Sequence, residues 1–218
     1  MKNKKILLAL SAATALAAAS SASAASNEIY AGVGTTGLGV GYAYGVNDRF
    51  SVRGQYDGMN YDGTYHNSGS DYKGKLDMSQ AGVYGDYFPF AGTFRITAGF
   101  VHTSSSFSGE ADGGSGTVQI NHVSYSLAGE SARIKIDLPS DMPYLGVGWG
   151  HNATKAGFGF FADLGLLFGN PKTHISLSPG LAAQVPPSDV TSEEHSINDD
   201  VKVLGGYPVA TVGFSYNF

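Results

Sequence analysis

The sequence predicts an all-β protein whose antiparallel strands close into a transmembrane β-barrel. Apolar residues alternate with small or polar ones along many short segments, as in strands that have two different faces. Charged residues are only 14% of the chain, against roughly 25% in soluble domains, and glycine accounts for 31 of 218 residues. No apolar run approaches the ~20 residues that a membrane-spanning helix needs. A soluble secreted β-sandwich is the competing fold class.

The chain begins with an expected export signal. Three lysines within the first five residues precede an apolar run, and Ala22 and Ala24 then form a small-residue cleavage site. This order is typical of a secretory signal peptide. We therefore expect residues 1–24 to be removed and residues 25–218 to form the barrel domain.

Charge and cysteine content exclude several classes of function. Loss of the three signal lysines moves the formal net charge from −5 to −8. Such an acidic chain argues against a nucleic-acid partner, because phosphate binding needs clustered Lys and Arg. The sequence has no cysteine, so disulfides and cysteine-ligated zinc sites are excluded.

The first four expected strands are 29–45, 50–65, 71–88 and 94–108. Their apolar faces carry, in order, Leu38, Val40, Tyr42 and Tyr44; Phe50, Val52 and Tyr56; Val83 and Tyr87; and Phe94, Ile96 and Phe100. The segments that separate them are rich in Asn, Asp, Gly and Pro, which favour tight turns.

The other four expected strands are 143–151, 157–169, 173–179 and 206–218. The segment 157–169 has the longest apolar stripe, made of Phe158, Phe160, Ala162, Leu164, Leu166 and Phe168. Between the two groups of strands the pattern is less regular. Asp112 to Gly116 predicts a loop tip, and 117–137 predicts either strand extensions past the membrane or an extra hairpin, which would make ten strands.

The sequence can be divided into eight strands in two ways. In the first, 29–45 is one long strand. In the second, Thr35-Thr36-Gly37 is a turn that divides this segment in two, and 173–179 belongs to a long external loop. Either way the number is even, which puts both chain ends on one side of the barrel.

A short amphipathic helix is expected over 188–203, within a connection. Val190, Ile197, Val201 and Leu204 recur at a spacing near 3.6 residues. Ser188 is a suitable helix cap, and acidic residues follow it where the helix dipole favours them. The alternative is a disordered acidic loop.

The last strand carries an aromatic face that ends on the final residue. Val212, Phe214, Tyr216 and Phe218 alternate with small or polar residues. This strand resembles the closing strand of bacterial outer-membrane barrels. The segments 143–150, 161–168 and 207–209 also resemble a set of poorly characterised outer-membrane barrel proteins. The resemblance implies insertion by the barrel-assembly machinery into the outer membrane of a Gram-negative bacterium, beside lipid and lipopolysaccharide, and it implies no activity.

If the apolar side chains of each strand face lipid, five charged residues point into the barrel: Arg53, Asp57, Asp86, Arg95 and Asp163. The interior of an eight-stranded barrel is just filled by side chains. An unpaired charge there is costly, so we expect an ion-paired, hydrogen-bonded plug. The inward glycines leave some room, which keeps a narrow small-solute channel as the alternative.

No catalytic, cofactor or metal site is predicted. Three His-x-Ser spacings, which begin at His102, His122 and His174, resemble the arrangement in outer-membrane lipid A deacylases. Their surroundings do not match that family, and no acidic partner follows from spacing. A solvated acidic loop explains Asp189 to Asp200 better than a calcium site does.

The sequence therefore predicts an exported eight-stranded barrel with a structural or surface-interaction role. Segments such as 109–142 would be available to an extracellular ligand, because loops on rigid scaffolds commonly carry binding sites. A small-solute channel is the second hypothesis, and a lipid-modifying enzyme is the third.

Overall fold

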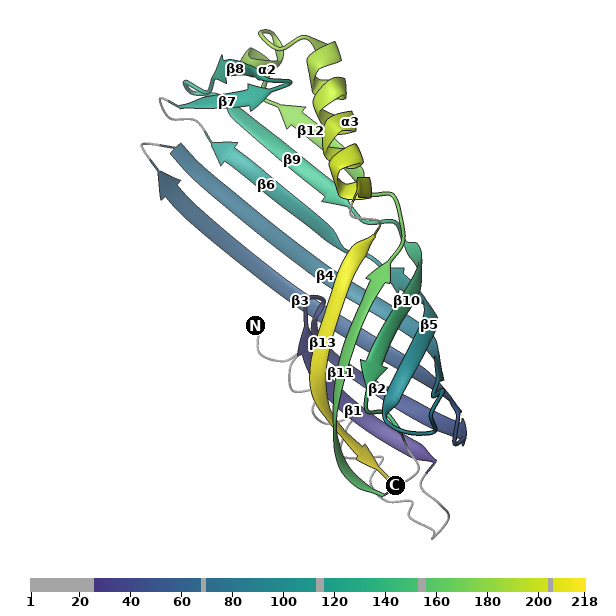
Figure 1. The fold of residues 1–218 in the computed structure, drawn as a ribbon. Helices are drawn as coiled ribbons and strands as arrows, with labels where there is room; N and C mark the ends of the chain where they lie inside the picture. Colours follow the sequence, from purple (N-terminus) through teal and green to yellow (C-terminus); the bar gives the residue numbers. More distant parts are fainter. Residues whose placement is uncertain (1–25, 68–69, 113–115, 153–155, 204–205) are drawn as a thin grey trace.

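The structure is a computed structural model that describes residues 26–67, 70–112, 116–152, 156–203 and 206–218. The expected signal peptide, parts of two expected loops (68–69 and 113–115) and Leu204 lie outside the described residues. Within the described part, thirteen strands and two helices are assigned (Figure 1). None of these helices is long and apolar enough to span a membrane.

The elements fall into a barrel and an extension above it (Figure 1). The barrel strands are β1 (Asn27–Gly34), β2 (Gly37–Asn47), β3 (Phe50–Asn67), β4 (Ser70–Tyr87), β5 (Phe94–Thr103), β10 (Asp141–Trp149), β11 (Gly157–Leu167) and β13 (Tyr207–Asn217). The remaining elements are β6 (Ser106–Asp112), β7 (Thr117–Ile120), β8 (Val123–Ser126), β9 (Ser131–Asp137), β12 (Lys172–Leu177), α2 (Pro179–Ala182) and α3 (Pro187–Val203).

Eight antiparallel strands close the ring. Their order is β4-β3-β2-β1-β13-β11-β10-β5, and β5 pairs back with β4. The start of β1 and the end of β13 meet at one end of the barrel, where Phe218 N donates to Asn27 O at 2.9 Å. The predicted all-β, eight-stranded, antiparallel barrel is therefore confirmed, and the ten-strand alternative is not realised.

The two faces of the wall follow the alternation in the sequence. Apolar side chains at every second position point away from the barrel, and Phe158 and Phe214 are 89% and 71% exposed. Neighbouring positions point inward and are buried. Because this pattern runs around the whole ring, the barrel has an apolar outer belt and a mixed, mostly polar interior.

Two expected strands are divided in the structure. The segment 29–45 forms β1 and β2, joined at Thr35-Thr36, and Gly37 has a φ of 101°, which glycine adopts readily. The second of the two strand assignments is therefore correct. The segment 94–108 forms β5 and the start of β6, so it was wrong to treat it as a single strand.

The second division arises because β4 is longer than the barrel wall. Its last eight residues pair with β5, whereas Asp71 to Asp77 pair with β6. β9 then pairs with β6, and β12 pairs with β9. The segment 117–137 therefore adds no strands to the ring. Its β7 and β8 form a separate hairpin, and its β9 belongs to a sheet that rises above the barrel from β3 and β4 (Figure 1).

The helix expected over 188–203 is present as α3 and lies along β12. It begins at Pro187, so Ser188 lies in the first turn and is not its cap. Glu194 Oε1 accepts a hydrogen bond from Ile175 N at 2.7 Å, and Asn198 Oδ1 accepts one from Thr173 Oγ1 at 2.8 Å. Because β12 is an edge strand, these contacts cover backbone and side-chain donors that would otherwise face solvent.

Candidate functional site

The structure places all five sequence-predicted charged residues inside the barrel. Arg53 and Asp57 come from β3, Asp86 from β4, Arg95 from β5 and Asp163 from β11. Each is at most 7% exposed. These side chains point inward because their neighbours along each strand point outward.

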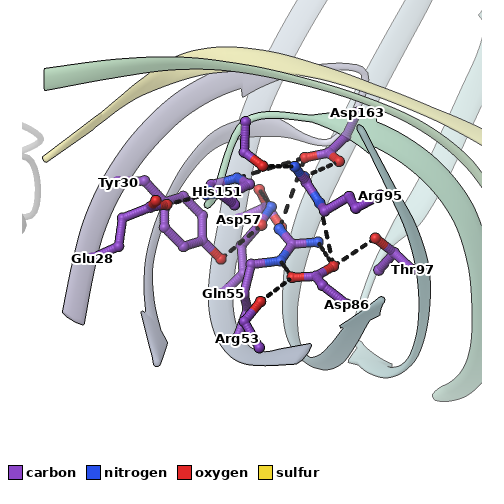
Figure 2. Close-up of polar contacts among 12 residues, drawn as sticks. Glu28, Tyr30, Arg53, Gln55, Asp57, Asp86, Arg95, Thr97, His151 and Asp163 are labelled. Atoms are coloured by element: carbon purple, nitrogen blue, oxygen red, sulfur yellow. Dashed lines mark hydrogen bonds and ion pairs between the residues drawn. The ribbon is translucent and has the colours of Figure 1, made fainter. Parts of the chain in front are cut away.

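Four of these residues form one network of alternating charge (Figure 2). Arg53 Nε lies 2.6 Å from Asp86 Oδ2, and Arg53 Nη1 lies 3.8 Å from Asp163 Oδ2. Arg95 Nε lies 3.3 Å from Asp86 Oδ1, and its Nη2 donates to Asp163 Oδ1. Each guanidinium is therefore shared between the same two carboxylates.

Neutral groups add further hydrogen bonds to this network, although Arg95 Nε is buried without a hydrogen bond. Asp86 accepts hydrogen bonds from Ser51 Oγ at 3.2 Å and from Thr97 Oγ1 at 2.6 Å. Arg95 Nη1 donates to the Gly150 carbonyl at 2.8 Å. Because a buried charge without partners is strongly destabilising, this degree of pairing explains how four charges are accommodated in so narrow a space.

Asp57 belongs to a second, adjoining group. Gln55 Nε2 donates to its Oδ1 at 2.8 Å, and Gln80 Nε2 donates to its Oδ2 at 3.2 Å. Gln55 in turn accepts a hydrogen bond from the Tyr30 hydroxyl at 3.2 Å. No arginine among the described residues lies within ion-pairing distance of Asp57. The predicted interior network is thus two groups, one ionic and one held by amides.

Sequence reasoning missed a buried pair at the end of the barrel where β1 begins and β13 ends. His151 Nδ1 contacts Glu28 Oε1, and His151 Nε2 lies 3.8 Å from Asp163 Oδ2. The imidazole centroid lies 4.4 Å from the Tyr30 ring and 4.2 Å from the Phe161 ring. The pair joins the charged network to an aromatic cluster and closes this end of the interior.

Of that pair, only Glu28 could have been predicted from the sequence pattern. Glu28 lies two residues before inward-facing Tyr30, so extending the alternation toward the N-terminus would have found it. His151 follows the last residue of β10 by two positions and has a φ of 58°. This left-handed backbone conformation is uncommon for a residue other than glycine, and no periodicity predicts it.

The interior becomes apolar toward the extension. Its buried residues there are Tyr84, Val101, Met142, Tyr144, Leu167 and Val209. The tyrosine rings lie against inward-facing glycines: a Cβ added to Gly165 would be 2.3 Å from the Tyr144 oxygen, and one added to Gly82 would be 2.4 Å from the Tyr84 oxygen. The inward glycines therefore leave no open room, because aromatic rings occupy the space beside them.

Little free volume remains between the polar and apolar layers. The space bounded by residues that include Arg53, Gln80, Tyr144 and Thr211 measures about 10 Å³. This is close to the smallest cavity that holds one water molecule, about 10–15 Å³. The interior is therefore tightly packed at this level.

The candidate catalytic and metal-ligating spacings of the sequence do not form sites among the described residues. No His-x-Ser pair is hydrogen-bonded: His102 Nδ1 instead lies 2.9 Å from Asp141 Oδ1, and His122 and His174 are exposed. No group of three or more His, Asp or Glu side chains in the described part is arranged to hold a metal ion.

The closing strand presents its expected aromatic face. Val212, Phe214 and Tyr216 of β13 point outward, and the Phe218 ring stacks on Tyr216 at 6.3 Å between centroids. β13 pairs with β1 on one side and with β11 on the other, so this strand is the closure of the ring.

Comparison with known proteins identifies the fold. No protein-family model matches the sequence, and no curated protein matches it. The crystal structure of Acinetobacter baumannii CarO matches with a TM-score of 0.64 at 20% sequence identity, over 89% of this chain and 98% of that chain. Acinetobacter baumannii CarO2 matches with a TM-score of 0.65 at 21% identity, over 88% and 98%. The predicted resemblance to small eight-stranded outer-membrane barrels is thereby confirmed at the level of the fold.

Proposed function

We propose that this chain is an integral outer-membrane protein of a Gram-negative bacterium with a structural or surface-interaction role. The packed interior carries the proposal, because the barrel leaves only about 10 Å³ between its charged and apolar layers. The apolar outer belt supports membrane insertion, since apolar side chains on the outward face are stable in contact with lipid. The likeness in fold to CarO supports the location.

The extension would face the cell exterior. Outer-membrane barrels carry short turns on the periplasmic side and longer segments outside. Here the start of β1, the end of β13 and the turn between β2 and β3 lie at one end, and the extension lies at the other (Figure 1). The surface available for interaction is therefore the sheet of β6, β9 and β12 with its helices.

The expected partners fit this placement. The outward face of β3 changes from apolar at Tyr56 to polar at Asn60 and Asp62, which marks the upper boundary of the lipid contact. Above that boundary the wall would meet lipopolysaccharide headgroups. The aromatic face of β13 would be the feature that the barrel-assembly machinery engages during insertion.

Conductance in planar bilayers tests this proposal against the channel alternative. The purified chain, without its signal peptide, is inserted into a bilayer that conducts when a general porin is added as a control. Heat-modifiability on a gel shows that the sample is folded. We expect no single-channel steps.

Reproducible steps from the folded protein would overturn the structural role in favour of a narrow channel. The enzyme hypothesis has its own test, in which the protein is incubated with lipopolysaccharide and the lipid is analysed by mass spectrometry. We expect the acyl chains to remain unchanged, and the loss of an acyl chain would contradict the proposal.

A further inference from the structure

The extension sheet has two chemically different faces. The face that continues the outer wall of the barrel is charged, with Lys73 Nζ 3.1 Å from Asp112 and Arg133 Nη2 2.7 Å from Glu110. The face that continues the inner wall is apolar. It carries Tyr61, Tyr65, Tyr72, Phe107, Ile134 and Ile175.

Only part of this apolar face is covered. Near β9 and β12 it packs under α2, α3 and the β7–β8 hairpin, where Ile120, Leu127 and Leu181 are buried. On β3 it is open, and Tyr61 and Tyr65 are 65% and 67% exposed. Between the covered and open parts lies a groove of about 690 Å³ that is bordered by β7 and α3.

Glycines form the floor of the groove. Gly63 pairs with Gly74, and Gly74 pairs with Gly109, so three glycines lie in line across β3, β4 and β6. A Cβ added to Gly74 would meet nothing within 4 Å, whereas one added to Gly63 would lie 3.2 Å from the Tyr61 ring and one added to Gly109 would lie 3.2 Å from Ile134 Cγ2. Two residues away along the strands stand Tyr61 and Tyr65 on β3, Tyr72 and Leu76 on β4, and Phe107 and Ala111 on β6. At ~3.3 Å per residue and ~4.8 Å per strand, the floor between these rows is about 13 Å by 10 Å.

A carboxylate at the border gives the groove a negative charge. Glu193 of α3 lines it, and its Oε2 accepts a hydrogen bond from Asn121 N at 2.8 Å. Among the described residues no cation is ion-paired with Glu193, whereas Lys73 and Arg133 are paired with acids on the opposite face of the sheet. The faces of the tyrosine rings are also negative.

From this shape and charge we propose that the groove binds a flat aromatic cation. A flat ring system fits over the open backbone at Gly74, and it can lie against the neighbouring tyrosine rings. A positive charge is attracted by those faces and by Glu193. The groove volume falls within the range of small-molecule sites, about 300–1,000 Å³. The site lies above the barrel, so it is independent of whether the barrel conducts.

Titration of the membrane-embedded protein with N-methylquinolinium tests the proposal. This probe is flat, aromatic, permanently charged and soluble in water, and isothermal titration calorimetry on protein in lipid nanodiscs reports its binding. Gly74→Leu fills the groove from its floor. Gly54→Leu is the matched control, because a Cβ at Gly54 also meets nothing within 4 Å but points to the outer face of the barrel. Glu193→Gln removes the charge and keeps an acceptor for Asn121.

We expect saturable binding to the wild type and to Gly54→Leu, and none to Gly74→Leu. Glu193→Gln should weaken binding about fivefold, the effect of one charge close to a hydrated ligand. If Gly74→Leu does not fold, as judged by heat-modifiability, Tyr65→Ser serves in its place and should also weaken binding. Equal binding to the two glycine variants, or none to the wild type, would overturn the site. Equal affinity of the probe for the wild type and for Glu193→Gln would overturn the proposal that the ligand is a cation.

Discussion

Replacement of Arg95 by methionine tests the charged network most severely. Arg95 is fully buried, contacts Asp86 and Asp163, and donates to the Gly150 carbonyl. Methionine keeps the apolar part of the side chain but removes the charge. Both carboxylates then share Arg53 alone. Because loss of one partner from a buried ion pair costs about 3–5 kcal/mol, we expect Arg95→Met to lower the free energy of unfolding by that amount.

Urea unfolding in detergent micelles measures this loss, and fluorescence of Trp149, the one tryptophan of the chain, reports it. The double variant Arg95→Met/Asp163→Asn should recover a large part of the stability, because it also removes the carboxylate that was left without a full partner. Ile96→Val, on the outward face beside Arg95, is the control and should cost less than about 1.5 kcal/mol. A loss below about 1 kcal/mol for Arg95→Met would refute the view that pairing of these charges supports the fold.

Three further changes probe other parts of the structure. Phe160→Arg, on the outward face of β11, should lower the free energy of unfolding in lipid vesicles by about 2–4 kcal/mol, and no loss there would contradict lipid contact at this position. Gly165→Ala should destabilise the barrel by about 1–3 kcal/mol in the urea assay, because the added methyl group would overlap the Tyr144 ring, and a neutral result would show that the interior is loosely packed. Glu194→Ala should speed amide exchange at Ile175 several-fold without changing the urea midpoint, and unchanged exchange would show that α3 does not protect β12.

Local pattern was sufficient to predict the barrel wall. Lipid and the barrel interior demand opposite side chains, so alternation in a segment such as 157–169 reports directly which positions face outward. The same alternation predicted the direction of Arg53, Asp86, Arg95 and Asp163 before any strand pairing was known. These predictions are robust because each depends on residues close together in the sequence.

Features that depend on pairing between distant segments were not predictable in the same way. The two halves of β4 have different partners, β5 and β6, and nothing within the segment 94–108 reports that the ring ends between them. The extension sheet arises from this divided pairing. The buried position of His151 likewise depends on a left-handed turn rather than on periodicity.

The inward glycines show a further limit of pattern reading. In the sequence they indicate open space, and this favoured the channel alternative. In the structure, Tyr84 and Tyr144 occupy that space beside glycines of their own strands and of the strands next to them. Whether a small residue leaves a gap depends on which side chain lies across from it, and that requires the register between strands.

Quenching of Trp149 by brominated phospholipids tests the central claim, an apolar outer belt in contact with lipid. Trp149 ends β10 on the outward face, is 48% exposed, and lies 5.4 Å from Phe94 between ring centroids, at the end of the barrel where β13 ends. Aromatic residues at this height form the girdle at the membrane interface. We predict strong quenching of the refolded protein by bromines placed near the lipid headgroups and weaker quenching by bromines near the bilayer centre. Fluorescence that resists both lipids but is quenched by aqueous acrylamide would contradict the account.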